Sequence, residues 1–414
     1  MRFVHMADIH FDSPFTVLAS KNNLANVRRL EQREAFRKAI EYIKTQQIPF
    51  LFISGDLYEQ EYIRESTIEY INNLFKTIPE TKIFIAPGNH DPFLNNSFYN
   101  NYNWSKNVTI FSGEIKRIEL EEADIYGYGF SSFYCTNSNV DEIEIKNKNK
   151  INILIAHGAL DASKTLDMQY NPINSNKLKN VGFDYVALGH IHKANYKNNE
   201  NNFIYPGSLI SFGFEELGEH GILDVEINKK NLEKNNLNKL NIKNNLEENK
   251  INKLEINNDS EKIKINNLKI NDNLEKNNLF NKETNKKAEE IKFVKLDSRI
   301  FEEKNIDVSD MDSEEELIEE INKIEIENQK NYKIILKGTR KIEINNNRIC
   351  KLIESESILK LKDKTEMEYN FDKLAKQKNL KGIFIKRMLE KLEKNPEQEK
   401  SIKKAMEIGL KSFE

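Results

Sequence analysis

With 414 residues, the chain exceeds the size of one ordinary domain and predicts two or three. Its contents of 31% charged and 38% hydrophobic residues indicate that one part of the chain is packed and another part is not. The net charge of −3 excludes a global positive field, so charge alone indicates no nucleic-acid partner.

Two cysteines, Cys135 and Cys350, lie far apart in the sequence, which excludes a disulfide framework and a cysteine-based zinc site. We expect two ordinary thiols in a reducing compartment. The sequence contains no run of about 18 apolar residues, so we expect no membrane span. The apolar part of residues 1–8 is too short for a signal peptide and predicts a first buried strand. We therefore expect a soluble, cytoplasmic protein.

Residues 1–227 alternate short apolar runs with helical patterns. Between the first three runs lie two amphipathic stretches, 27–45 and 66–76, with apolar residues at helical spacing. This β-α-β-α order predicts an α/β domain built in layers. The expected strands are Phe3–Ala7, Phe50–Ser54, Lys82–Ala86, Ile151–Ala156, Tyr185–Leu188 and Ile222–Ile227.

The segment 228–290 has a different composition. Asparagine makes up 20 of the 58 residues from Asn228 to Asn285, and the heptapeptide at 231–237 recurs at 273–279. Asparagine at this density disfavours both helices and strands, so we expect a low-complexity, largely disordered linker or insertion. The alternative is a weak helical or coiled-coil protrusion, because Leu and Ile still recur every three to five residues.

Residues 291–370 predict a small α/β domain after the linker. A helix is expected at 313–326, where Ser313 is a suitable N-cap and Glu316 has the capping-box spacing. The expected strands are 291–296 and 332–336.

Residues 371–414 predict a helical tail. Two helical patterns, 381–393 and 396–411, are separated by Asn395-Pro396, and Pro396 fits the first turn of the second helix. Each pattern carries an apolar stripe that includes methionine, which suits an adaptable contact surface for a partner helix. The alternative is that the stripes fold back on the small domain as ordinary core. The stripes are Ile383, Phe384, Met388, Leu389 and Leu392, and then Ile402, Ala405, Met406 and Leu410.

Five of the seven histidines lie at or just after the carboxyl end of an expected strand, where ligands bind in open α/β sheets. A single histidine there is more often a satisfied polar residue than a ligand. Five of them, accompanied by two aspartates and one asparagine, indicate a functional site. The motifs are Asp8-Ile9-His10, Gly55-Asp56, Gly88-Asn89-His90-Asp91, His157-Gly158 and Gly189-His190-Ile191-His192.

The residue types and spacing of these motifs predict metal binding. In an extended backbone, the outer residues of Asp-Ile-His and His-Ile-His point to one side, while Ile9 and Ile191 point into apolar packing. Imidazole, carboxylate and amide ligands without thiolate suit Mn²⁺, Fe²⁺ or Zn²⁺. These motifs supply more ligands than a single ion can use if it keeps one coordination position open for substrate. We therefore expect two ions, with Asp56 between them.

In this order, the motifs resemble those of the calcineurin-like metallophosphoesterases. Within that superfamily, the chain resembles the SbcD/YhaO-like DNA repair exonuclease branch over residues 1–227. Residues 291–360 resemble the small cap domain of that family only loosely. The stretches that carry the resemblance are 10–15, Gly55–Tyr58, Ala187–Lys193, Tyr205–Ser208 and Gly218–Gly221.

The resemblance implies a metallo-dependent phosphatase fold: an α/β, layered β-sandwich flanked by helices, with a small α/β cap domain and a helical C-terminal tail. It also implies two divalent metal ions, Mn²⁺ in the first place, with Fe²⁺, Zn²⁺ or Mg²⁺ as alternatives. One ion would take Asp8, His10, Asp56 and His192, and the second would take Asp56, Asn89, His157 and His190.

His90 matches the catalytic histidine of the family, which stabilises the charged phosphorane or donates a proton to the leaving 3′ oxygen. Asp12 and Asp91 are either partners that orient an imidazole or simple turn caps. Many family members carry a second histidine soon after the Gly-Asp motif, whereas residues 55–61 contain none. Processivity and strand polarity therefore do not carry over from the family.

The two remaining histidines have ordinary interpretations. His5 lies inside an expected strand and is predicted to be a core or sheet-face residue. His220 lies in a glycine-flanked turn and is predicted to be exposed.

The resemblance implies a metal-dependent phosphoesterase, and the leading hypothesis is a DNA exonuclease or endonuclease subunit of a DNA repair complex. One alternative is a phosphodiesterase for cyclic or small nucleotides, although the cap-like segment and the tail favour a polymeric substrate. Another is a mainly scaffolding partner of an SMC-like ATPase. The family also implies a DNA substrate, a YhaN- or SbcC-type ATPase as partner and, as a further option, a homodimer.

Overall fold

The computed structural model of the chain describes residues 1–15, 24–162, 170–198, 202–228, 289–327 and 329–413. The chain divides into two compact units, Met1–Ile300 and Phe301–Glu414. Because residues 229–288 lie outside the described part, the low-complexity linker stays a prediction.

The first unit is built on two β-sheets. One sheet has six strands in the order β11-β10-β1-β2-β3-β4. Strands β1 to β4 are parallel, while β10 is antiparallel to β1 and β11 is antiparallel to β10. The strands are β1 (Arg2–Met6), β2 (Phe50–Ile53), β3 (Lys82–Ile85), β4 (Val108–Ile110), β10 (Gly221–Ile227) and β11 (Glu289–Lys295).

The other sheet has five strands in the order β5-β6-β7-β8-β9. Strands β6 to β9 are parallel, and β5 is an antiparallel edge strand. The strands are β5 (Lys116–Glu119), β6 (Ala123–Tyr128), β7 (Ile151–His157), β8 (Tyr185–Gly189) and β9 (Phe203–Ile204). Each of the six strands expected in residues 1–227 is therefore present.

The two sheets pack around a shared apolar core. Successive residues of a strand point to opposite faces, and Phe3, Phe52 and Phe84 from the six-stranded sheet meet Ile153 and Tyr185 from the other. The rings of Phe3 and Tyr185 pack edge to face with centroids 5.0 Å apart. The expected layered β-sandwich is confirmed.

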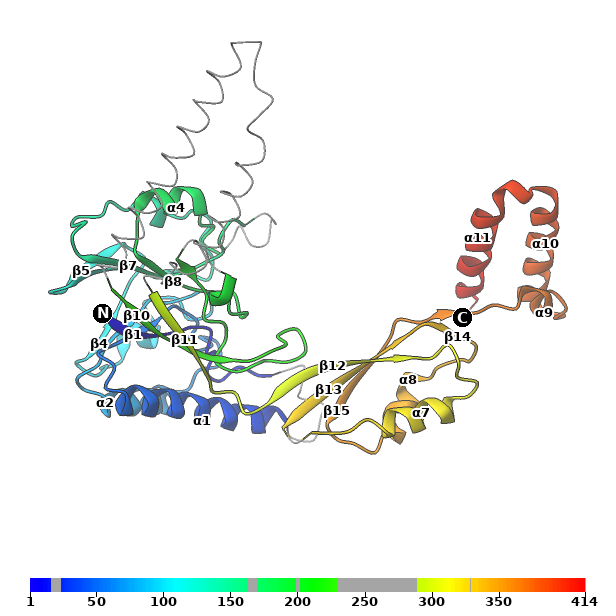
Figure 1. Cartoon of the computed structure of the whole chain (residues 1–414), viewed down its shortest axis with the longest axis horizontal. Coiled ribbons are helices and arrows are strands. Elements are labelled where there is room, and N and C mark those ends of the chain that lie inside the picture. The colour runs from blue at the N-terminus through cyan, green and yellow to red at the C-terminus, as the bar shows by residue number, and fades with distance from the viewer. Residues whose placement is uncertain (16–23, 163–169, 199–201, 229–288, 328, 414) are drawn as a thin grey trace, which may run out of the picture. The chain divides into compact units, whose positions relative to one another are not determined.

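Helices flank the sandwich on both sides (Figure 1). Helices α1 (Leu24–Thr45) and α2 (Glu65–Lys76) lie along the six-stranded sheet, as the two amphipathic stretches predicted. Helix α4 (Ser175–Val181) covers the five-stranded sheet, where Leu178 joins the apolar cluster of that face. The fold is the mixed α/β arrangement that the resemblance implied.

The second unit contains a three-stranded sheet in the order β12-β13-β15. Helices α7 and α8 bury Leu317, Ile321 and Ile349 in its core. Ser313 caps α7, since its side chain accepts a hydrogen bond from the backbone N–H of Glu316, as predicted. The elements are β12 (Ile300–Asp307), α7 (Glu314–Asn322), β13 (Lys330–Lys337), β14 (Thr339–Arg340), α8 (Asn346–Leu352), β15 (Ile358–Asp363) and β16 (Glu366–Met367).

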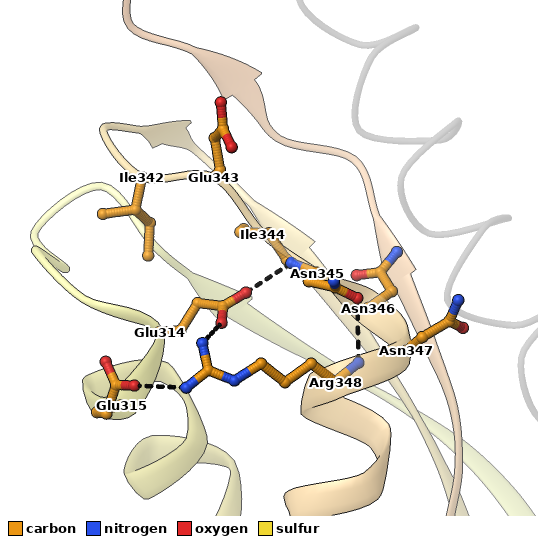
Figure 2. A pocket seen from close by; sticks show the side chains of 9 residues that line it. All are labelled: Glu314, Glu315, Ile342, Glu343, Ile344, Asn345, Asn346, Asn347 and Arg348. Carbon is orange, nitrogen blue, oxygen red and sulfur yellow. Dashed lines mark hydrogen bonds and ion pairs between the residues drawn. The ribbon is translucent and has the colours of Figure 1, made fainter. Parts of the chain in front are cut away.

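A pocket beside α7 and α8 contains an ion-pair network (Figure 2). The guanidinium of Arg348 contacts the carboxylates of Glu314 and Glu315, with N–O distances of 2.8 and 3.0 Å. Glu314 also accepts a hydrogen bond from the backbone N–H of Asn345. These contacts tie α7 to the start of α8.

Strand β11 belongs to the first unit, whereas the sequence placed residues 291–296 at the start of the small domain. It pairs with β10 from Gly221 to Ile227. The difference arises because the partner strand precedes the linker, and a strand's sequence does not reveal which strand it pairs with.

The tail forms a helical hairpin. Ile385, Ile402, Met406 and Leu410 form its buried core, so the two apolar stripes pack largely against one another. Leu380, Ile383 and Ile408 stay more than half exposed. The elements are α9 (Phe371–Ala375), α10 (Leu380–Lys394), the 3₁₀ turn Pro396–Gln398 and α11 (Glu399–Lys411).

Within the described residues, no helix is long and apolar enough to cross a membrane. Cys135 is half-buried and Cys350 is exposed, and both are free thiols.

Candidate metal centre

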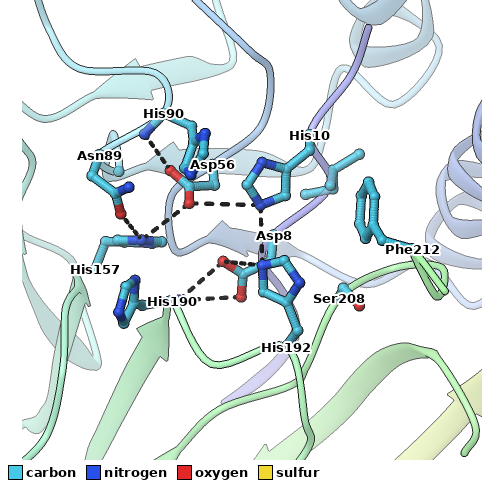
Figure 3. A network of polar contacts seen from close by, with 12 residues as sticks. Asp8, His10, Asp56, Asn89, His90, His157, His190, His192, Ser208 and Phe212 are labelled. Carbon is cyan, nitrogen blue, oxygen red and sulfur yellow. Dashed lines mark hydrogen bonds and ion pairs between the residues drawn. The ribbon is translucent and has the colours of Figure 1, made fainter. Parts of the chain in front are cut away.

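The predicted site residues lie at the ends of five strands. Strands β1, β2 and β3 are parallel in one sheet, and β7 and β8 are parallel in the other. Their carboxyl ends bring the predicted side chains together, as Figure 3 shows. Asp8 and His10 follow β1, Asp56 follows β2, Asn89 and His90 follow β3, His157 ends β7, and His190 and His192 follow β8.

The backbone is strained where it presents these side chains. Asp8 and His10 have φ values of 52°, Asp56 has 53° and His190 has 108°. Residues other than glycine rarely adopt such angles, and this strain clusters at functional sites. Gly88 permits a close approach, because a Cβ there would lie 2.2 Å from Oδ1 of Asp56.

Asp8, His10 and His192 form one group of potential ligands, with ligand atoms that all lie within 4.8 Å of one another. The Nε2 atoms of His10 and His192 are 3.2 Å apart, and Nε2 of His192 is 4.0 Å from Oδ1 of Asp8. Asp8 is fully buried, and its carboxylate also accepts the backbone N–H of His190.

A second group surrounds His157, which is fully buried. Its Nε2 lies 3.0 Å from Oδ1 of Asn89 and 3.3 Å from Oδ2 of Asp56. The ring of His190 packs against His157 with centroids 5.4 Å apart. Oδ2 of Asp56 is also 3.6 Å from Nε2 of His10, so this carboxylate lies between the two groups.

Three contacts orient the imidazoles from behind. Nδ1–H of His10 donates to Glu59 at 2.8 Å, and Nδ1–H of His192 donates to Glu216 at 2.6 Å. Nδ1–H of His157 donates to the backbone carbonyl of Ser54 at 2.9 Å. Because carboxylates and carbonyls only accept, Nδ1 of each ring carries a proton and Nε2 is the nitrogen that faces the centre, where it can bind a metal ion once its own proton is lost.

This arrangement fits a bound metal. The Nε2 atoms of His10 and His192 lie 3.2 Å apart next to buried carboxylates, so both can turn to one ion. Nitrogen and oxygen ligands without thiolate suit Mn²⁺, Fe²⁺ or Zn²⁺. Carboxylates and carbonyls on the far nitrogens of ligating histidines are also typical of metal sites.

The pKa values of the buried residues also indicate that this site favours positive charge. Burial opposes protonation of His157, but the Asp56 carboxylate outweighs it and raises the pKa of His157 to about 9. Burial alone would raise the pKa of Asp56, yet His157 and His10 hold it well below its usual value. Burial and the neighbouring His157 lower the pKa of His190 to about 3.

Glu59 and Glu216 were not predicted as site residues. Glu59 lies in the stretch where the family carries its second histidine, and the absence of that histidine was the only signal. Burial would raise the pKa of Glu59, but hydrogen bonds from His10 and His90 outweigh it and lower the pKa to about 2. Nothing in the sequence pointed to Glu216, because its hydrogen bond with His192 joins two residues that are 24 positions apart in the chain.

Residues 1–194 match the family model of the calcineurin-like phosphoesterases. The chain carries a calcineurin-like phosphoesterase domain. The five strand ends of the site all fall within the matched residues.

Curated relatives extend the likeness. The chain is 27% identical over 237 residues to YhaO, a metallophosphoesterase of Bacillus subtilis, with a match that covers 55% of this chain and 57% of YhaO. It is 28% identical over 272 residues to the D component of the SbcCD nuclease of Staphylococcus epidermidis, covering 55% of this chain and 67% of that protein. The same component from Staphylococcus saprophyticus is 25% identical over 266 residues.

His90 lies at the rim of the candidate metal centre, with its side chain 46% exposed. Its Nδ1–H donates to Glu59 at 2.8 Å, and its backbone N–H donates to Asp56 at 2.9 Å. Burial opposes protonation, but the hydrogen bond to Glu59 outweighs it and raises the pKa of His90 to about 9. Glu59 therefore binds both His10 and His90.

Asp12 and Asp91 do not orient an imidazole among the described residues. The carboxylate of Asp91 accepts backbone N–H groups of Asp56, Leu57 and Gly88 and the hydroxyl of Tyr99. Asp91 thus shapes the loops that carry the ligands.

Asp12 accepts hydrogen bonds from the Thr67 hydroxyl and the backbone N–H of Arg64 at the start of α2. The turn-capping alternative describes this residue better. Asp12 and Asp91 each lie next to proposed ligands in the sequence, but this proximity did not reveal which groups their carboxylates contact.

His5 is a buried core residue as predicted, bonded to Tyr185 and Ser54. The prediction for His220 was wrong: it is buried and bonds to Ser208 and to the carbonyl of Glu216. Ile9 is buried as predicted, but Ile191 is 42% exposed, because φ of 108° at His190 breaks the extended backbone on which that prediction depended.

Proposed function

We propose that this chain is a two-metal phosphodiesterase that acts on DNA as an exonuclease or endonuclease subunit of a DNA repair complex. The observation that carries the proposal is the set of three imidazoles whose Nε2 atoms face two buried carboxylates. Their orientation is enforced by Glu59, Glu216 and the carbonyl of Ser54. The family match of residues 1–194 supports a phosphoester as the reacting group.

Two ions are proposed because the ligands divide into two groups around Asp56. We favour Mn²⁺, with Fe²⁺, Zn²⁺ and Mg²⁺ as alternatives, since every ligand atom is nitrogen or oxygen. One ion would be held by Asp8, His10, Asp56 and His192, and the other by Asp56, Asn89, His157 and His190.

When bound, such ions lower the pKa of a water, polarise the phosphoryl oxygens and neutralise developing charge. His90 supplies the proton for the leaving 3′ oxygen. Its Nδ1–H is held by Glu59, so Nε2 is the nitrogen that can reach substrate from a half-exposed side chain. In the metal-free chain the hydrogen bond to Glu59 outweighs burial and raises the pKa of His90 to about 9, which favours the protonated form that a general acid needs.

DNA is favoured over a cyclic or small nucleotide by the rest of the chain. The second unit adds a folded sheet and a helical hairpin outside the phosphoesterase domain, and a small substrate needs no such additional surface. Two relatives are named as nuclease subunits. The complete ligand set also argues against scaffolding as the only role.

An SMC-like ATPase of the YhaN or SbcC type is the proposed partner in the cytoplasm, and a homodimer is the proposed oligomer. The support is that two relatives are named subunits of the SbcCD nuclease. In the tail, Leu380 and Ile383 at the start of α10 are exposed apolar residues that a partner helix could cover.

Purified protein should be incubated with Mn²⁺ and, separately, labelled linear duplex, single-stranded DNA and a chromogenic phosphodiester. We expect cleavage of DNA and of the chromogenic ester, and loss of both with a chelator. Hydrolysis of cyclic nucleotides with intact DNA would favour the small-nucleotide alternative. Lack of hydrolysis of every substrate by protein that holds two ions would contradict the proposal.

A further inference from the structure

The loop from Ser208 to Glu216, here called the Glu216 loop, borders the metal centre. Glu216 accepts the Nδ1–H of His192 at 2.6 Å. The ring of Phe212 lies 5.4 Å from that of His10 and 5.6 Å from that of His192, centroid to centroid. Any shift of this loop therefore changes the surroundings of two proposed ligands.

A buried ion pair holds the loop from its other side. The guanidinium of Arg28 donates two hydrogen bonds of 3.0 Å to the carboxylate of Asp297. Asp297 also accepts the backbone N–H of Ser211 at 2.8 Å, while Arg28 donates to the Ser211 carbonyl at 2.7 Å. Both backbone groups of one loop residue are thus bound by the pair.

The hydrogen bonds continue from Ser211 to Glu216. The Ser211 hydroxyl donates to the Glu216 carbonyl at 2.8 Å, and the Glu216 carboxylate accepts the backbone N–H of Phe212 at 3.1 Å. A second route runs through His220, whose carbonyl accepts the backbone N–H of Asp297 and whose ring bonds the Glu216 carbonyl at 3.0 Å.

We propose that Asp297 is a positioning residue that orients His192 through the Glu216 loop. Asp297 lies two residues after β11 and four residues before the second unit begins at Phe301. The segment that leads into that unit is therefore bonded to the metal centre, and a change in this segment alters metal binding. The consequence for metal rests on the proposed two-metal site.

The ion pair makes this link stiff. Arg28 is fully buried and Asp297 is 4% exposed. Separating a buried pair is strongly unfavourable, so Arg28 on α1 holds Asp297 in place. Ser211 of the loop is hydrogen-bonded to both members of the pair, and these bonds hold the loop to the segment.

The test compares Mn²⁺ binding by calorimetry in the full chain and in Asp297→Ala, Glu216→Gln and the double variant. We expect each single change to weaken one Mn²⁺ site about 10- to 100-fold, the usual effect of losing an outer partner of a ligand. The double variant should bind no more weakly than Glu216→Gln alone, because both changes act through one contact. Additive losses, or unchanged affinity, would overturn the proposal.

Asp224→Ala is the matched control. Asp224 is also a buried carboxylate that accepts two hydrogen bonds from an arginine, Arg2, and it lies on β10 of the same unit. This change should lower the melting temperature without changing Mn²⁺ affinity. An equal loss of affinity there would show that lost stability, and not positioning, explains the Asp297 result.

The double variant Arg28→Met/Asp297→Leu separates loss of the contact from loss of the fold, since apolar side chains can replace a buried ion pair without loss of stability. This variant should fold yet keep the weakened Mn²⁺ site. Amide exchange in metal-free protein gives a readout that does not depend on metal: exchange at residues 208–216 should rise. If wild type binds no Mn²⁺, the proposed function fails, and unchanged exchange at 208–216 overturns the role of Asp297.

Discussion

His10 and His192 face each other through Nε2 atoms 3.2 Å apart. Each ring donates its Nδ1 proton to a glutamate, so neither is free to turn its Nε2 away. At this distance one of the two nitrogens must take up a proton or bind a metal ion. Burial opposes protonation of His192, but its hydrogen bond to Glu216 outweighs burial and raises the pKa of His192 to about 9, so in the metal-free protein this ring carries the proton that a metal ion would replace. This contact connects the first strand end of one sheet with β8 of the other, and it is the clearest structural sign of a metal site.

Asp56→Asn should abolish hydrolysis. The carboxylate lies between both ligand groups, and an amide carries no charge and has a single acceptor oxygen. We expect fewer than two ions per chain by metal analysis and an activity loss of more than about 100-fold, since even outer partners typically cost 10- to 100-fold. The metal-free protein should unfold at nearly the wild-type temperature. A variant with two ions and full activity would refute the binuclear assignment.

His90→Ala should bind both ions yet lose activity on DNA by about 10²- to 10⁴-fold, the usual contribution of a general acid. The defect should be smaller on a chromogenic ester, whose leaving group needs no proton. If metal content falls together with activity, His90 is a ligand instead.

Glu59→Gln should impair two histidines at once, because Glu59 accepts from both His10 and His90. A glutamine has one acceptor oxygen, so at least one ring loses its partner. We expect weaker Mn²⁺ binding and an activity loss of about 10- to 100-fold. Glu61→Gln, two residues away and exposed, is the control and should behave as wild type.

Replacing residues 229–288 with a short Gly/Ser linker should leave hydrolysis of short substrates nearly unchanged. The composition of this segment offers little apolar area to offset the entropy cost of ordering it, and loop length costs little free energy. Slow amide exchange throughout the segment in the intact protein would contradict this prediction.

Leu380→Lys with Ile383→Lys should eliminate co-purification with the proposed ATPase while the hairpin stays folded. Both side chains are exposed, at 72% and 52%, so the change removes an apolar surface without disturbing the buried core. Met406→Lys is the contrasting variant: it buries a charge in the hairpin and should melt it. Retained co-purification with the first variant would place docking elsewhere.

Much of the site was predictable because its residues follow strands that are recognisable from their apolar runs. In parallel strands of one sheet, such positions converge at one edge, so the residues after β1, β2 and β3 form one group and those after β7 and β8 form another. These positions could be named from the sequence and their roles from the family resemblance, whereas the packing of the two sheets brings the two groups together. The two flanking helices and the cap at Ser313 follow from local patterns of the same kind.

The sequence by itself therefore determined the strand ends that carry the site, the residue types found there and the α/β class of the first domain. Only the tertiary structure decided the contacts across long separations. Glu216 reaching His192, Asp297 holding Ser211, β11 joining β10 and the burial of His220 all depend on which distant segments meet. Periodicity reports which face of an element is apolar, but a hydrogen-bonded partner is chosen by three-dimensional proximity, which no local pattern encodes.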